Sequence, residues 1–162
     1  MLVFEDSLYQ VPTMELINSI TRMSSLINEL YIYNLLSDEK NSIVFYSFDS
    51  ENIDINNFPC GLIYNVEENE NNLNIYIMFI ATKYGYRSCG YASDFIKEFM
   101  TFIKNKYNNR ENIMIILDSI EKSVLFYEHI GFKWITTYEY NKKLHILDDD
   151  ELEHFVMCYN LY

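Results

Sequence analysis

Residues 81–93 read Ala81-Thr-Lys-Tyr-Gly-Tyr-Arg-Ser-Cys-Gly-Tyr-Ala-Ser93 and contain Gly85 and Gly90, two of the protein's 4 glycines. A strand-like apolar run precedes this stretch and a helix-like pattern follows it. Glycine lets a backbone turn tightly and approach a ligand, and a helix start directs free N–H groups toward an anion. The stretch therefore predicts a phosphate-binding loop. The alternative is an ordinary loop before a helix, since neither a Walker sequence nor a three-glycine dinucleotide motif is present.

The segments before this loop predict helix followed by three antiparallel strands. Apolar residues recur at helical spacing over residues 13–36, which predicts one amphipathic helix or two short helices broken near Ser24-Ser25. Residues 42–48, 60–66 and 73–82 are rich in Ile, Val, Tyr and Phe, and polar stretches separate them. That pattern is typical of strands.

The segments after the loop predict a strand-helix-strand unit. Apolar periodicity indicates a helix over residues 91–107, and the continuous apolar run Ile113–Leu117 is typical of a strand buried on both faces. We therefore expect a parallel pair. A second helix over about 120–130 is expected, with Ser119 as its candidate cap and Gly131 just past its end.

Two more strands are expected at the end of the chain, over residues 132–140 and 154–161, on either side of the acidic segment 147–153. The predicted order is β-α-β-β-β-α-β-α-β-β. This is an α/β fold with a mixed, mostly antiparallel sheet and one β-α-β unit. A length of 162 residues predicts a single domain, residues 1–162. The last strand is expected at a sheet edge, and its pairing across a homodimer is the alternative.

Composition excludes several classes of partner. With 24 acidic and 12 basic residues, the net charge of −12 repels nucleic-acid phosphates and anionic membrane surfaces. The longest apolar run, residues 75–81, is too short to span a bilayer, and no secretory signal is apparent. The 3 cysteines are too few for a disulfide framework, and they show no metal-ligand spacing with the histidines. We expect a cytoplasmic protein without a metal site.

Two motifs resemble one known family. Arg87-Ser-Cys-Gly-Tyr-Ala92 resembles the Arg/Gln-x-x-Gly-x-Gly/Ala signature of the GCN5-related N-acetyltransferases (GNAT family), and it lies between a predicted strand and a predicted helix. Phe126-Tyr-Glu-His-Ile-Gly-Phe132 is similar to the family's Phe-Tyr-Glu-x-x-Gly-Phe segment. The resemblance covers residues 73–132 by motif and nearly the whole chain by element order. It implies the GNAT fold and an acetyltransferase domain.

The resemblance also implies an acetyl-CoA site. Its pyrophosphate would be held by backbone N–H groups of the loop, with the Ser93 hydroxyl as a further donor; the loop residues are Arg87, Ser88, Cys89, Gly90, Tyr91 and Ala92. The strand ending at Thr82 would pair with the pantetheine arm, and a backbone amide near Ile80 would polarise the thioester carbonyl. Because the family transfers acetyl directly to an amine, Cys89 is expected to be non-catalytic.

Tyr127 matches the family position of a tyrosine that protonates the departing CoA thiolate. A phenol with a reference pKa of about 10 is protonated at neutral pH and can act as an acid. Simple packing of Tyr127 on its helix is the alternative. For the general base, Asp118 is the nearest carboxylate along the chain, although it also suits a capping or solvated role; His154 is a weaker candidate.

The acceptor is expected to be a primary amine, small or peptidic. The acidic run Asp148-Asp-Asp-Glu151, with Glu153, would attract a cationic acceptor such as a polyamine, an aminosugar or a protein amine; a solvated charged loop is the alternative. Ile120 and Ser123 stand where many members carry Asn and Ala, and Tyr84 and Ser88 where Pro and Gly are common. A catalytically inactive CoA-binding or protein-interaction module is therefore the second reading of the sequence.

Overall fold

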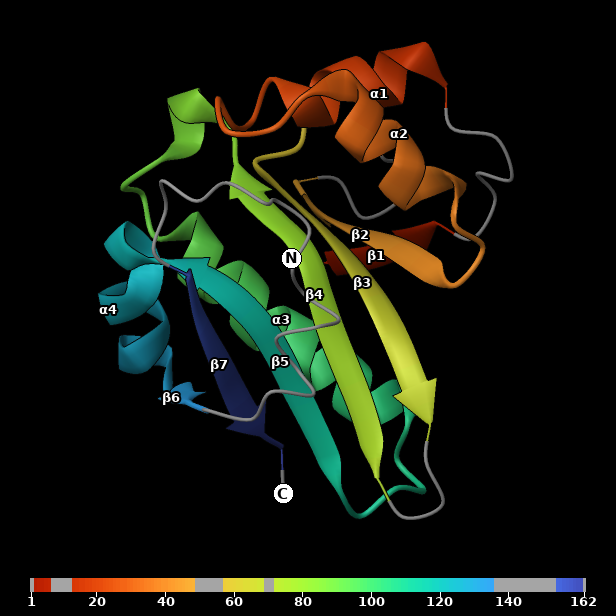
Figure 1. Ribbon diagram of the computed structural model, residues 1–162, viewed down its shortest axis with the longest axis vertical. Coiled ribbons are helices and arrows are strands. Elements are labelled where there is room, and N and C mark those ends of the chain that lie inside the picture. The colour runs from red at the N-terminus through yellow and green to blue at the C-terminus, as the bar shows by residue number, and fades with distance from the viewer. Residues whose placement is uncertain (1, 7–12, 49–56, 69–71, 136–153, 162) are drawn as a thin grey trace. The chain divides into compact units, whose positions relative to one another are not determined.

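The computed structural model describes residues 2–6, 13–48, 57–68, 72–135 and 154–161 (Figure 1). Its elements occur in the order β1 (Leu2–Asp6), α1 (Met14–Thr21), α2 (Glu29–Ser37), β2 (Asn41–Ser47), β3 (Cys60–Glu68), β4 (Leu73–Thr82), the 3-10 turn η1 (Tyr84–Tyr86), α3 (Tyr91–Lys106), β5 (Ile113–Ile120), α4 (Glu121–Ile130), β6 (Lys133–Trp134) and β7 (His154–Asn160). The predicted order of strands and helices is confirmed.

The predicted helical segment 13–36 forms two helices because polar side chains cap each one separately. Thr13 Oγ1 accepts from the backbone N–H of Leu16 at 3.3 Å at the start of α1. Asn28 Oδ1 accepts from the N–H of Tyr31 at 2.9 Å at the start of α2. These side chains satisfy N–H groups that a helix start leaves unpaired.

Seven strands of the described part of the chain form one mixed sheet in the order β1-β2-β3-β4-β5-β7-β6. Strand β2 pairs antiparallel with β1 and β3. Strand β4 pairs parallel with β5 over Leu73–Ile77 and Ile113–Leu117, and β7 pairs antiparallel with β5 and β6. The mostly antiparallel sheet with one β-α-β unit is thus as predicted.

The chain divides into two compact units. The first contains residues 1–65 and 79–106, and the second contains residues 66–78 and 107–162. The strands β3 and β4 run through both. The prediction of a single domain stays a prediction.

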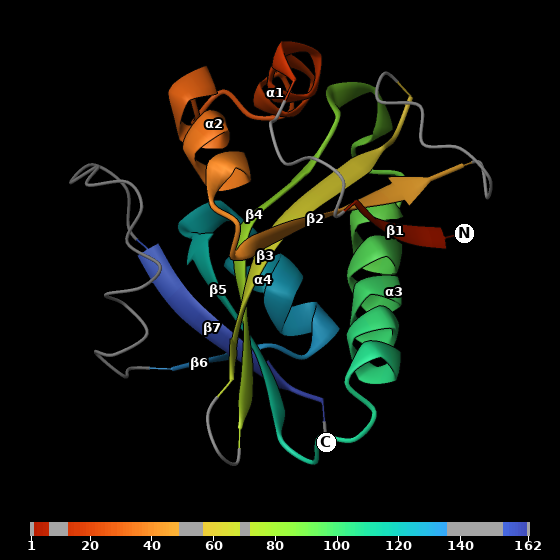
Figure 2. The ribbon, with the colours of Figure 1, turned by 90° about the vertical axis from the view of Figure 1, so that its right-hand side faces the viewer.

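In the first unit, helices cover both faces of β2 and β3, with α3 on one face and α2 on the other (Figure 2). On the α3 face, Tyr46 contacts Phe95 with ring centroids 5.5 Å apart, and Tyr64 contacts Phe99 at 5.2 Å. Gly61 faces the other side, where an added Cβ would lie 3.8 Å from the sulfur of Met23. Both faces therefore exclude water, which explains the continuous apolar run in β2.

In the second unit, α4 ends in a left-handed glycine cap. Gly131 has φ 111°, and its N–H donates to the carbonyls of Tyr127 and Glu128 at 3.1 and 2.9 Å. The N–H of Phe132 donates to the same Tyr127 carbonyl at 3.0 Å. This hydrogen-bond pattern satisfies the last carbonyls of a helix and turns the chain sharply. Phe132 then packs on Tyr159 of β7, with centroids 5.5 Å apart.

Three details differ from the sequence predictions. Ser119 does not cap α4, because β5 continues to Ile120 and Ser119 Oγ donates to the Ile120 carbonyl at 3.0 Å. The helix cap is Ile120, which has no polar side chain. Strand β7 is not an edge strand, since it lies between β5 and β6. The predicted strand 132–140 is described only up to residue 135, where β6 covers Lys133–Trp134.

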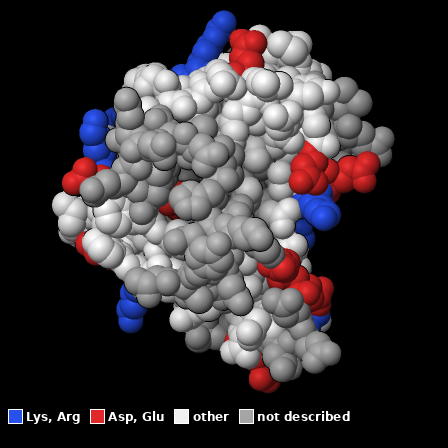
Figure 3. All heavy atoms as spheres, in the orientation of Figure 1, with Lys and Arg blue, Asp and Glu red and all other residues white. Residues whose placement is uncertain are grey.

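Among the residues that the structure describes, no helix has the length and apolar character needed to cross a bilayer. Within the same ranges, no cluster of three or more His, Cys, Asp and Glu residues is placed to hold a metal. On the face shown in Figure 3, the basic groups of the described residues are scattered and form no continuous stripe.

Candidate functional site: the loop between β4 and α3

The end of β4 changes from buried to accessible within a few residues. Leu73–Ile77 are buried on both faces, whereas Ile80 and Thr82 are half-buried. The parallel register with β5 ends at Ile77, so the backbone of β4 beyond that point is not used in that pairing. Ile80 and Thr82, two of the predicted cofactor-binding residues, thus lie at the partly accessible end of β4, in the first unit.

The loop after β4 contains two residues in the left-handed region. Ser88 has φ 62° and Gly90 has φ 84°. Gly90 suits this conformation, while Ser88 adopts it against the steric preference of its Cβ. This conformation explains why glycine would be the less strained residue at position 88. Gly85, by contrast, does not have a positive φ, and a Cβ added there would meet no other atom within 4 Å.

The first turn of α3 presents a group of backbone donors next to these residues. The N–H of Asp94 donates to the Gly90 carbonyl at 3.1 Å, which makes Gly90 the residue at the helix start. The N–H groups of Tyr91, Ala92 and Ser93 therefore have no carbonyl partner within the helix. Ser88, Cys89 and Gly90 are exposed, and Tyr91, Ala92 and Ser93 are half-buried. These backbone N–H groups lie at the positive end of the helix dipole, and this combination suits the binding of a phosphate group.

The Arg87 side chain anchors the loop. Its Nε donates to the Thr82 carbonyl at 3.2 Å, and its Nη2 donates to the Met23 carbonyl at 2.8 Å. The guanidinium also stacks over the Tyr84 ring, 3.7 Å from the ring centroid. The Arg87 side chain is thus held by the protein itself and fixes the shape of the loop.

The Tyr91 side chain joins an aromatic cluster with Phe48 and Tyr86. The three ring centroids lie 5.5 to 5.8 Å apart, and the Tyr86 hydroxyl donates to Asn57 Oδ1 at 3.0 Å. These contacts tie the end of β2 to both sides of the loop. Tyr91 therefore positions the start of α3.

Two cysteines belong to this region and differ in environment. Cys89 is exposed, and its Sγ lies 3.5 Å from the Arg87 carbonyl. Cys60 is buried, with its Sγ 3.2 Å from Thr82 Oγ1 at the end of β4. Burial raises the pKa of Cys60 from 9.0 to about 11, so its thiol stays protonated and unreactive at neutral pH.

Tyr127, the candidate acid, lies in the second unit on α4. It is only 8% exposed, and its ring packs edge-on against Phe126 and Phe132, with centroids 5.1 and 5.6 Å away. Burial raises the pKa of its phenol well above the ordinary 10.0. The hydroxyl is therefore protonated over the whole physiological range, which an acid requires.

The candidate bases have different positions. Asp118 is half-buried and lies within β5 opposite Val156, because the strand continues beyond the predicted run Ile113–Leu117 to Ile120. His154 begins β7, opposite Ile120. The acidic residues 148–151 and Glu153 lie outside the described residues.

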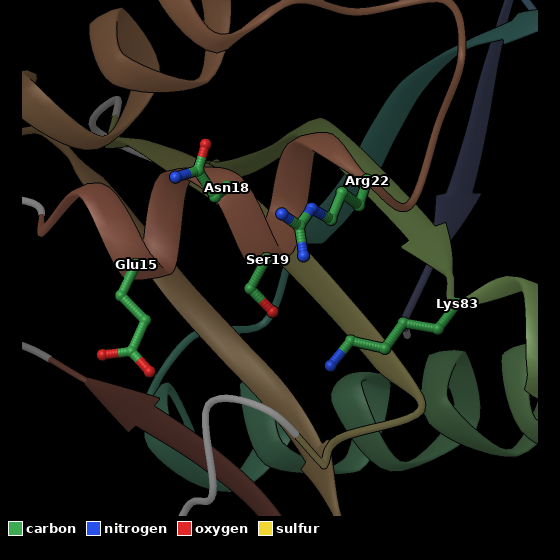
Figure 4. A pocket seen from close by; sticks show the side chains of 5 residues that line it. All are labelled: Glu15, Asn18, Ser19, Arg22 and Lys83. Carbon is green, nitrogen blue, oxygen red and sulfur yellow. The ribbon is translucent and has the colours of Figure 1, made fainter.

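A polar pocket on α1 was not predicted from the sequence. It has a volume of about 410 Å³ and is lined by Glu15, Asn18, Ser19, Arg22 and Lys83, all of the first unit (Figure 4). The signal was present in the sequence, because Glu15, Asn18 and Ser19 of α1 and its C-cap residue Arg22 recur at i, i+3, i+4 and i+7.

Comparison with solved structures identifies the fold, whereas the sequence comparisons give no match: no family model and no curated protein matches this chain. Tetrahymena GCN5 aligns with a TM-score of 0.65 at 14% identity, over 92% of this chain and 86% of its own. Arabidopsis thaliana Naa50, in complex with the bisubstrate analogue CoA-Ac-MVNAL, aligns with a TM-score of 0.59 at 16% identity, over 98% of this chain and 99% of its own.

An aminoglycoside 6'-N-acetyltransferase complexed with coenzyme A aligns with a TM-score of 0.63 at 9% identity, over 100% of this chain and 98% of its own. At such identities the likeness concerns the arrangement of the backbone. It agrees with the element order and with the strand-loop-helix unit described above. The protein therefore has the fold of the GCN5-related N-acetyltransferases, as the two sequence motifs predicted.

Proposed function

We propose that this protein is an N-acetyltransferase that transfers the acetyl group of acetyl-CoA directly to a primary amine. The observation that carries the proposal is the loop at the end of β4. There, left-handed Ser88 and Gly90 lead into a helix start with free N–H groups. The anchoring of Arg87 leaves these backbone donors to hold the pyrophosphate.

In this proposal the accessible end of β4 binds the pantetheine arm. The backbone at Thr82 pairs with it, and the N–H near Ile80 donates to the thioester carbonyl as negative charge develops on that oxygen. The amine nitrogen attacks the carbonyl carbon, the new C–N bond forms and the C–S bond breaks. Holding both reactants in this geometry supplies much of the rate acceleration.

Tyr127 supplies the proton for the departing thiolate. Burial raises the pKa of this phenol, which keeps it protonated at neutral pH but also makes it a weaker acid. In this proposal the hydroxyl therefore donates a hydrogen bond to the departing thiolate, and the proton is delivered as the C–S bond breaks. The amine must lose a proton, and Asp118 is the proposed acceptor of that proton. The free cysteines fit a reducing compartment, and we place the reaction in the cytoplasm.

For the acceptor we propose a cationic amine, since the protein carries a net charge of −12 and attracts cations over a distance. A peptide amine is one form: the structure of Naa50 contains an analogue that joins CoA to a peptide. An aminosugar is another, and an aminoglycoside acetyltransferase is among the similar structures.

The first experiment measures the thermal midpoint with and without acetyl-CoA. A ligand that binds only the folded state stabilises it by about 2.7 kcal/mol at 100 times its dissociation constant. We expect a clear upward shift for the wild type and for Gly85→Ala, and a smaller shift for Gly90→Ala. The pair is matched because both changes add one methyl group in the same loop, but only Gly90 has a positive φ.

Thiol release from acetyl-CoA, screened against polyamines, aminosugars and peptides, then tests catalysis. Turnover with any amine supports the acetyltransferase. A thermal shift without turnover for every amine would favour the inactive CoA-binding module, for which the argument is that Ile120 stands where many family members carry Asn. No shift at millimolar acetyl-CoA would count against both CoA-binding readings and favour a protein-interaction module.

A further inference from the structure

A second polar pocket lies in the second unit, where β4 and β5 begin and β7 ends. Its volume is about 300 Å³, at the lower end of the range of small-molecule sites. The described residues that line it are four asparagines and two apolar residues, namely Asn72, Asn74, Asn112, Asn160, Ile113 and Met114. None of these side chains carries a formal charge. This asparagine pocket therefore suits an uncharged ligand that exchanges hydrogen bonds with carboxamides.

The register of the sheet places three of these side chains in one row. Asn74 of β4 is the partner of Met114 of β5, and Met114 is the partner of Asn160 of β7. Directly opposite residues of neighbouring strands point to the same face of a sheet. The two asparagines thus flank Met114 on one face. Met114 also packs against the buried apolar cluster of the next row, which consists of Tyr76, Ile116 and Cys158.

Asn74 is the buried member of this row. It is only 6% exposed, and its side chain forms no hydrogen bond with any residue that the structure describes. Such a group is rare, because buried side-chain amides nearly always have a hydrogen-bond partner. Asn72 and Asn160 are exposed and likewise have no side-chain partner in the described parts of the chain. Since all three line the pocket, a molecule bound there reaches their donors and acceptors.

The backbone around the pocket is fixed by the sheet. The N–H of Leu73 donates to the Asn112 carbonyl at 2.9 Å, and the N–H of Leu161 donates to the Ile113 carbonyl at 2.9 Å. These bonds join the starts of β4 and β5 to each other and to the end of β7. A ligand therefore meets a wall that is already ordered, which lowers the entropic cost of binding.

The chemistry of the lining favours a flat ring with a polar edge. A carboxamide presents an acceptor oxygen and a donor nitrogen side by side, so its complement is an edge with a donor next to an acceptor. Adenine has such an edge, the N6 amino group beside N7, and asparagine binds these two atoms together in a bidentate pair. Beside Asn74, Met114 supplies a thioether, a group that makes favourable contacts with aromatic rings.

We propose that the asparagine pocket binds the adenine base of an uncharged molecule, either adenine itself or its nucleoside. Asn74 Oδ1 accepts from the N6 amino group, and Asn74 Nδ2 donates to N7. The ring lies against Met114, and the exposed amides of Asn72 and Asn160 bind its remaining polar atoms or the ribose hydroxyls. Phosphorylated forms are disfavoured, because the lining holds no cation and the protein carries a net charge of −12.

The experiment is a calorimetric titration of the full chain with adenine and with adenosine. It contains no acetyl-CoA, so its result is independent of the proposed acetyl transfer. We expect dissociation constants below about 1 mM. N6,N6-dimethyladenine keeps the ring but lacks the N6 donor, and it should bind at least tenfold more weakly. AMP should bind more weakly than adenosine at low salt, since it adds a phosphate to the same nucleoside.

Variants test the residues of the pocket. Asn74→Leu keeps the approximate size of the side chain but removes its donor and acceptor, and it should weaken adenine at least tenfold. Asn74→Ala repeats this test without adding apolar atoms, and Asn160→Ala, at an exposed position, should weaken adenosine about threefold or more. Asn109→Leu removes an exposed amide in the turn before β5 and is the control, which should bind as the wild type does. The thermal midpoint of each variant without ligand shows that it folds.

Three results would each overturn the proposal. One is the absence of measurable heat with both adenine and adenosine at millimolar concentration. Another is equal binding of adenine and N6,N6-dimethyladenine, because a site built on a paired donor and acceptor must distinguish them. The third is tighter binding of AMP than of adenosine, which would place recognition on the phosphate.

Discussion

The Arg87 guanidinium donates a hydrogen bond of 2.8 Å to the backbone carbonyl of Met23, a residue 64 positions earlier in the chain. This contact connects the segment between α1 and α2 to the loop that follows β4. A second bond to the Thr82 carbonyl and the stacking on Tyr84 complete the anchor. The shape of the candidate cofactor loop thus depends on a long-range contact of one side chain.

Arg87→Ala should lower both stability and cofactor affinity. The variant loses hydrogen bonds made by a charged donor, together with a cation–π contact, so we expect the free energy of unfolding to fall by about 1–3 kcal/mol. Urea unfolding measures this change, and calorimetry with acetyl-CoA measures the affinity. Arg87→Lys should restore little of either, because an ammonium cannot reproduce the planar fork. Full recovery with lysine would show that charge alone matters.

Ser88→Gly should stabilise the protein. Serine at φ 62° carries the steric cost of the left-handed region, about 1 kcal/mol, which glycine does not. We expect urea unfolding to show a gain of roughly that size, with acetyl-CoA affinity within a factor of about 3 of the wild type. A loss of stability would mean that the Ser88 side chain contributes more than its backbone strain costs.

Tyr127→Phe should lower kcat with little change in the KM for acetyl-CoA. General acids typically contribute about 10²–10⁴-fold to a rate, so a loss of at least tenfold is expected. Phenylalanine keeps the ring contacts with Phe126 and Phe132, and the thermal midpoint should stay close to that of the wild type. Tyr159→Phe, a matched change in the same unit, should leave kcat unchanged. Unchanged turnover in Tyr127→Phe would leave Tyr127 with a packing role only.

Gly131→Ala should destabilise the protein. Alanine at φ 111° is strained, and its Cβ would lie 3.1 Å from Cε2 of Tyr159. We expect a loss of about 1–3 kcal/mol in urea unfolding. Gly85→Ala has open space and an ordinary backbone, so the same measurement should show no loss or a small gain. Equal effects of the two changes would contradict the cap described for α4.

The buried thiol of Cys60 should make stability fall at alkaline pH. Its pKa is raised from 9.0 to about 11, so the unfolded chain releases this proton at a lower pH than the folded protein. The stabilisation is fully present below pH 9 and is lost as pH rises toward 11, by at most about 1.4 kcal/mol per pH unit. Urea unfolding from pH 8 to 11 should show a shallower decline in Cys60→Ala. If the free energy of unfolding fell equally with pH in the wild type and in Cys60→Ala, Cys60 would be excluded as a cause of the alkaline loss of stability.

Short-range patterns in the sequence predicted most of the fold. Apolar periodicity located α3, β4 and β5, because a strand or helix with a buried face must repeat its apolar residues with its own period. Gly90 and Gly131 marked two helix boundaries, and both have the positive φ that only glycine adopts without strain. The two motifs then predicted the fold that the structural comparison established.

Only the tertiary structure decided the features that depend on distant contacts. The acceptor for Arg87 is a backbone carbonyl, which every residue carries and which leaves no mark in the sequence. Likewise, β7 pairs on both edges, and Lys83 completes a pocket begun on α1, because the folded chain brings these segments together. The periodicity of apolar residues indicates which face of a helix or strand is buried. It does not indicate which helices and strands come together to form a site.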